Sequence, residues 1–135
     1  MTTKHFIAKD ICVDAGLIMI FDKDYINQYG FREDNSIDGG KEMNIDPGTW
    51  RCYWDIEETY NGPVDGHGIL EVTSGKVLII DPCYVLEDWD KWLKDTDCGC
   101  IVPDGTLILD SMGGDGTYEV VLRLELINAK KVVNG

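Results

Sequence analysis

Two Asp-x-x-Tyr segments hold the residues of this chain best suited to chemistry. Asp22 and Tyr25 form one, Asp81 and Tyr84 form the other, and each follows an apolar run. Two carboxylates that converge could hold a cation or perform general acid–base catalysis. Alternatively, each Asp caps the short helical turn after it by accepting hydrogen bonds from free backbone amides. Capping is the favoured interpretation, and convergence is the alternative.

The cysteines are weak candidates for chemistry. Cys83 would begin a predicted helix, where the dipole favours a thiolate, but nucleophilic catalysis also needs a base. Nothing in the sequence places His67, the only plausible base, beside that thiol. Cys98 and Cys100 are spaced too closely for a typical structural zinc site. We therefore expect inert thiols, no disulfide framework, no metal and no cofactor.

Tyr53 and Asp115 complete the set of binding candidates. Residues 49–58 alternate with period two, which places Trp50 and Trp54 on one face of a strand and Tyr53 on the other. Asp115 lies in a glycine-rich loop at residues 113–116. That loop leads into a strand and has no following Lys, so it predicts a turn rather than a phosphate-binding loop.

The elements that position these residues occur twice along the chain. Residues 13–26 and 72–85 share the pattern V-x-x-G, a short apolar run, D-x-x-Y and an aliphatic residue. A second match follows in the same order, because residues 48–50 read G-T-W and residues 116–118 read G-T-Y. The repeated residues are those that a hairpin and a capped helix require. The pattern therefore indicates internal duplication more than it indicates an active site.

Each half is predicted to contain a hairpin, a short helix, a variable loop and a long alternating strand. The hairpins pair residues 6–13 with 17–21 and 68–73 with 76–80; the helices are 25–29 and 85–94; the long strands are 49–58 and 117–126. We predict one α+β domain, mostly β, made of two tandem halves (about 5–60 and 64–128). These halves would pack as a sandwich or a small barrel with one or two short helices.

The charge restricts the partner. The chain of 135 residues has 25 acidic and 12 basic residues, a net charge of −13. This argues against direct binding of nucleic acid, which needs a basic face. It is compatible with a solubilising surface, a basic partner, a bound cation or mimicry of nucleic-acid charge. No signal-peptide pattern is visible and the apolar runs are far shorter than a membrane span, so we expect a cytoplasmic protein without membrane association.

The second half resembles an uncharacterised family of small phage and bacterial proteins. The resemblance rests on D-P-C-Y-V at residues 81–85, Trp89, and G-D-G-T-Y-E-V at residues 114–120. The family's V-D-A-G element is present at residues 13–16, but it precedes D-P-C-Y here instead of following it. The resemblance implies a phage, prophage or mobile-element origin in a bacterial host cell. It supplies no catalytic residues.

The favoured function is that of a non-enzymatic acidic binding protein that occupies a protein partner with a basic surface. Its sharpest form is an inhibitor of a host defence system that competes with nucleic acid for a basic groove. One alternative is a small-ligand or nucleotide-binding protein with its pocket between the halves; another is a hydrolase using Asp22, Asp81 or Cys83. We also expect a homodimer, paired through an exposed edge of the final strand. The binding candidates are Asp22, Tyr25, Tyr53, Asp81, Tyr84 and Asp115.

Overall fold

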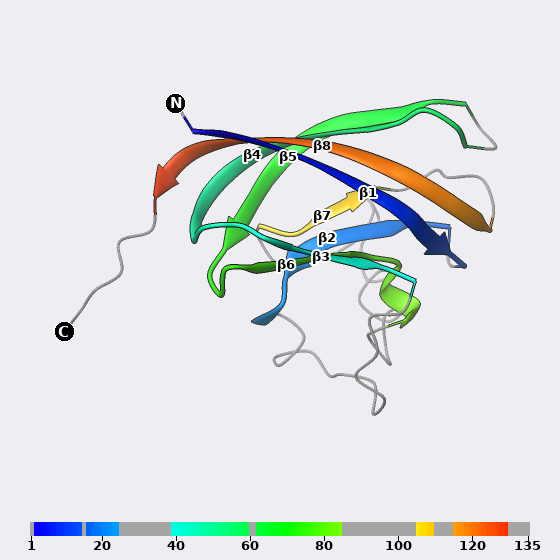
Figure 1. Cartoon of the computed structure of the whole chain (residues 1–135), viewed down its shortest axis with the longest axis horizontal. Coiled ribbons are helices and arrows are strands. Elements are labelled where there is room, and N and C mark those ends of the chain that lie inside the picture. The colour runs from blue at the N-terminus through cyan, green and yellow to red at the C-terminus, as the bar shows by residue number, and fades with distance from the viewer. Residues whose placement is uncertain are drawn as a thin grey trace, which may run out of the picture.

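Two four-stranded antiparallel sheets pack face to face (Figure 1). They are seen in a computed structural model that describes residues 2–14, 16–24, 39–59, 62–84, 105–109 and 115–129. Sheet A has the order β1 (Thr3–Val13), β8 (Gly116–Ala129), β4 (Gly48–Ile56), β5 (Val64–Val72). Sheet B has the order β3 (Lys41–Asn44), β6 (Lys76–Ile80), β2 (Ile18–Asp22), β7 (Leu107–Leu109). The predicted β-rich sandwich is confirmed.

Both predicted hairpins are wrong, because their two strands belong to different sheets. β1 pairs with β8, whereas β2 pairs with β6 and β7. Likewise β5 pairs with β4 in sheet A, and β6 lies in sheet B. The glycine turns are present, with φ of 81° at Gly16 and 83° at Gly75. A positive-φ glycine reverses the chain equally well within a sheet or between layers, so the sequence pattern does not distinguish the two.

The strand order is unchanged when corresponding strands of the two halves are exchanged. The exchange pairs β1 with β5, β2 with β6, β3 with β7 and β4 with β8. After it, the strand order of each sheet reads the same from the opposite edge, so the same strands remain adjacent. All six ladders between described strands join a strand of the first half to a strand of the second. This topology is what two halves related by a twofold axis would show.

The two sheets bury their side chains differently. Along β4 and β8 of sheet A, buried inward positions alternate with outward positions that are more exposed. In sheet B, all five residues of β2 and four of five in β6 are buried. Strands covered on both faces read as continuous apolar runs, and strands covered on one face read as alternation. The apolar runs at 17–21 and 77–80 therefore become the centre of sheet B.

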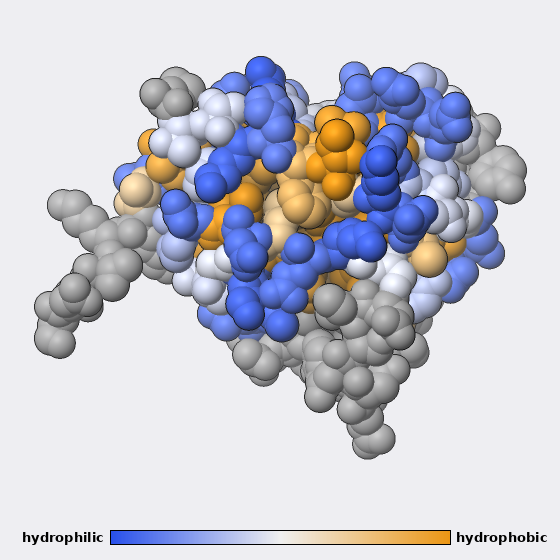
Figure 2. All heavy atoms as spheres, viewed as in Figure 1, coloured by the Kyte–Doolittle hydropathy of each residue, from blue (hydrophilic) through white to orange (hydrophobic). Residues whose placement is uncertain are grey.

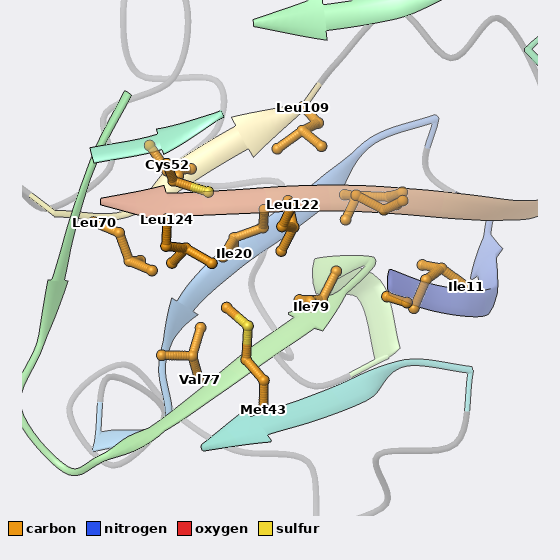
Figure 3. Close-up of a cluster of buried hydrophobic side chains, with 14 of the residues drawn as sticks. Ile11, Ile20, Met43, Cys52, Leu70, Val77, Ile79, Leu109, Leu122 and Leu124 are labelled. Atoms are coloured by element: carbon orange, nitrogen blue, oxygen red, sulfur yellow. The ribbon is translucent and has the colours of Figure 1, made fainter. Parts of the chain in front are cut away.

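The core lies between the two layers. Ile20 and Ile79 of sheet B face Leu122 and Leu124 of sheet A (Figure 3). In the space-filling view, apolar residues gather in the middle of the molecule with hydrophilic residues around them (Figure 2). Trp50 is fully buried in this core, as the alternation predicts.

β8 provides no edge for a second copy. It lies between β1 and β4 and is paired on both sides, so the predicted route to a homodimer through this strand is wrong. Its alternating pattern indicates a long strand with one exposed face, and that pattern is the same at the centre or the edge of a sheet.

Several predictions fall outside the described residues. They are the helices at 25–29 and 85–94, Tyr25, Trp89, Cys98 and Cys100. Next to them in the described part of the chain, Asp24 is helical and a short 3-10 turn, η1 (Pro82–Tyr84), precedes the second predicted helix. No helix in that part is long and apolar enough to cross a membrane.

Candidate functional site

Asp81 is a buried hydrogen-bond acceptor at the end of β6. Its side chain is 0 % exposed. One carboxylate oxygen accepts the N–H of Cys83 at 3.0 Å, which caps η1. The other accepts the N–H of Asp14 at 2.9 Å, in the turn between β1 and β2. The capping interpretation is therefore right for one oxygen of Asp81, while the second oxygen holds a turn from the other half of the chain.

Tyr84 extends this cluster through its side chain. Its hydroxyl donates a short hydrogen bond to the Asp14 carboxylate. That bond, together with desolvation and the negative charge of Asp14, raises the pKa of Tyr84 far above its usual value. Tyr84 is thus a protonated donor that helps to hold the β1–β2 turn.

Asp22 occupies the equivalent place at the end of β2. One oxygen accepts the N–H of Asp24 at 2.9 Å. The other accepts the N–H groups of Thr73 at 2.6 Å and Ser74 at 3.0 Å, in the turn between β5 and β6. Burial alone would raise the pKa of Asp22, but the hydrogen bonds from Ser74, Asp24 and Thr73 outweigh it and hold the pKa below 3.8.

The two aspartates make the same crossed contacts. Asp24 and Cys83 each lie two residues after their Asp, and Asp14 and Thr73 occupy the same position before the turn glycine. Each carboxylate therefore accepts one N–H from the residue two positions after its Asp and another N–H from the turn of the opposite half. We call these contacts the two Asp clasps. Sequence reasoning found the local bonds but not the crossed ones, which join residues more than 50 positions apart.

The hypothesis that Asp22 and Asp81 converge is wrong. Asp22 lies opposite Val77, and Asp81 follows Ile80, which lies opposite Met19. The two carboxylates are therefore at opposite ends of the β2–β6 ladder, separated along the strands by about 13 Å at roughly 3.3 Å per residue. They do not form a shared acid–base or cation site.

The described thiols do not form a catalytic pair with histidine. His67 is on the exposed face of β5 in sheet A, whereas Cys83 follows β6 of sheet B. Cys52 is fully buried, and desolvation raises its pKa to about 12, so it remains a thiol in the core. Within the described residues, no group of three or more His, Cys, Asp or Glu is placed to hold a metal ion.

An acidic cavity of about 490 Å³ lies at one end of the outer face of sheet A. A β-bulge between Ala8 and Ile11 shapes one wall, where Asp10 has a φ of 60°. The charged residues in its lining are Asp10, Asp55, Glu57, Glu58, Glu119 and the single cation Lys9. We call this the acidic cavity. Its carboxylates come from β1, β8 and the end of β4, so no local sequence motif indicated it.

Asp115 lies beside the acidic cavity. It is exposed and lines a neighbouring cavity of about 310 Å³ together with Glu58, which belongs to both. Among the predicted binding residues, Asp115 is thus the one placed beside the acidic cavity, and it immediately precedes Gly116, which lies opposite Val13 of β1.

Tyr53 lies at the middle of the same outer face. The guanidinium of Arg123 on β8 is 4.2 Å from the centre of its ring. The ring of His67 on β5 is 5.8 Å away on the neighbouring strand, and Arg123 also contacts Glu125 at 3.6 Å. The prediction that Tyr53 faces away from the core is confirmed.

Comparisons with protein-family models, with curated proteins and with solved structures found no match to this chain.

Proposed function

We propose that this protein is a non-enzymatic binding protein of phage or mobile-element origin that occupies a basic surface of a protein partner. The observation that carries the proposal is the acidic cavity, where five carboxylates and one lysine line about 490 Å³. Carboxylates grouped in a concave surface focus the local field and attract a cationic side chain. A protruding lysine or arginine of the partner has the charge and shape to enter it.

The sharpest form of the proposal is an inhibitor of a host defence protein that normally binds nucleic acid. Such a protein has a basic groove, and a chain with net charge −13 would compete for it. Complementary charge accelerates encounter and makes binding sensitive to salt. The Asp clasps contribute to the fold in this proposal and not to binding, because their carboxylate oxygens accept backbone N–H groups.

A binding assay with matched charge variants tests the proposal. The probe is a fluorescent arginine-rich peptide, titrated at about 50 mM and about 500 mM salt. We compare Glu119→Gln, in the acidic cavity, with Asp46→Asn, an exposed carboxylate between β3 and β4. Both variants remove one negative charge.

We expect Glu119→Gln to weaken peptide binding by roughly two- to fivefold, the range for one exposed ion pair. Asp46→Asn should change binding much less, because its charge lies outside the acidic cavity. Equal losses in the two variants would show that only net charge attracts the peptide. Binding that is unaffected by salt would also overturn the proposal.

A further inference from the structure

Exposed apolar side chains are concentrated on sheet A. Among the described residues, the exposed large apolar side chains are Ile7 (56 %), Ile127 (52 %), Ile69 (40 %) and Val121 (39 %). All four belong to strands of sheet A. Ile7 and Val121 lie directly opposite each other in the β1–β8 ladder, so they form one patch. Contiguous exposed apolar side chains with polar neighbours mark interaction surfaces.

This patch adjoins both the acidic cavity and Tyr53. Val121 itself lines the acidic cavity, and it lies opposite Asp55 on β4. Tyr53 and Arg123 occupy the next outward positions along the same two strands. Tyrosine and arginine are enriched among the residues that dominate binding energy at protein interfaces. We infer that this outer face is a docking surface for a partner that presents apolar side chains bordered by lysine or arginine. The inference rests on the proposed function and names its surface.

The charge of the face favours such a partner over a second copy of the chain. Eight carboxylates lie on this face or in its acidic cavity. Five occupy outward strand positions: Asp55, Asp65, Glu71, Glu119 and Glu125. The other three are cavity residues: Asp10, Glu57 and Glu58. The cations on the same strands are Lys4, Lys9, Arg51 and Arg123, and Arg123 already contacts Glu125. Two such faces brought together would repel each other, whereas a basic surface would be attracted.

The size of the face suits a specific contact. Four strands about 4.8 Å apart and about nine residues long, at roughly 3.3 Å per residue, give an area of about 570 Å². Covering it would bury about 1,100 Å² on the two partners together, close to the lower limit of about 1,000 Å² for a specific interface. A contact of this size depends on its apolar centre as well as on its charged border.

Two peptides of equal length and charge separate the contribution of the apolar centre to binding from that of the charged border. One combines arginine with leucine, and the other combines arginine with serine. The variants are Ile7→Thr, in the patch, and Ile127→Thr, a similarly exposed isoleucine about 20 Å along β8 from Val121. Ile127 lies beyond Glu125, the last residue of β8 that pairs with β1, and so outside the docking surface. Threonine keeps the branched Cβ that suits a strand, and circular dichroism melts check that both variants remain folded.

The leucine peptide should bind the natural protein about tenfold more tightly than the serine peptide, a difference of about 1.4 kcal/mol. Ile7→Thr should reduce this advantage by several-fold and leave the affinity for the serine peptide unchanged. Ile127→Thr should change neither affinity.

Each other outcome has a defined meaning. If both peptides bind equally and Ile7→Thr has no effect, the docking surface is wrong while the proposed function stands. If neither peptide binds at low salt, both are overturned. If sedimentation shows a dimer that Ile7→Thr dissociates, a second copy is the occupant and the inference is overturned.

Discussion

Sheet B is covered on both faces, whereas sheet A leaves one face open. In sheet B, Met19, Phe21, Leu78 and Ile80 are fully buried although they point away from the core between the sheets. In sheet A, the corresponding outward positions hold Tyr53, Arg123 and Val121, all accessible to solvent. Both sheets contribute side chains to the core between them, but only sheet B also buries its outer face, so the outer face of sheet A is the one left free to interact.

The largest expected effect breaks sheet B. Phe21→Ala should lower the free energy of unfolding by about 3–5 kcal/mol, because it removes a large buried ring and leaves a cavity. Urea denaturation measures the loss. Ile7→Ala on the outer face is the matched control and should change stability by about 0.5 kcal/mol or less. Similar losses in the two variants would contradict the difference between the sheets.

A smaller effect is expected where the two sheets are joined. Asp81→Ala leaves the N–H groups of Cys83 and Asp14 without their acceptor, so it should lower stability by about 2–3 kcal/mol. Asp81→Asn keeps an acceptor oxygen and should lose less. Thermal unfolding followed by circular dichroism compares the two. A loss from Asp81→Ala no greater than that from Asp46→Asn would show that this Asp clasp does not stabilise the junction.

The smallest expected effect is a pH dependence at the other Asp clasp. The pKa of Asp22 is below 3.8 in the folded chain, so its ionised form contributes stability at pH values above 3.8. That contribution is lost as the pH falls from 3.8 through the folded-state pKa. Asp22→Asn should therefore flatten the fall in melting temperature over this acidic range. Parallel curves for the natural protein and the variant would contradict the pKa of Asp22 in the folded state.

Local patterns in the sequence predict the strands better than their partners. The period-two alternation of residues 49–58 correctly places Trp50 inside and Tyr53 outside, because the alternation of side chains depends only on the strand that contains them. Strand pairing is different, because every described ladder joins the two halves and none can be recognised from neighbouring residues. This is why both predicted hairpins are wrong although their glycine turns exist.

In the candidate sites too, local contacts could be predicted from the sequence and long-range contacts could not. The local hydrogen bond from Cys83 to Asp81 is predicted by the capping pattern, and the bond from Thr73 to Asp22 is not. The acidic cavity needs the bulge at Asp10 and the pairing of β8 with β4 to bring Glu119 near Glu57. Long-range register creates that cavity, so composition could only indicate that the surface is acidic.

The pairing of each half with the other also constrains the order of events during synthesis. β8 is the last described strand to be made, and β1 and β4 both pair with it. At about 5–20 residues per second, β1 waits on the order of ten seconds before its partner exists. Until then its inward apolar side chains have no sheet to join, and long-range pairing is intrinsically slow. The inward apolar side chains of β1 therefore stay without their sheet until β8 has been made.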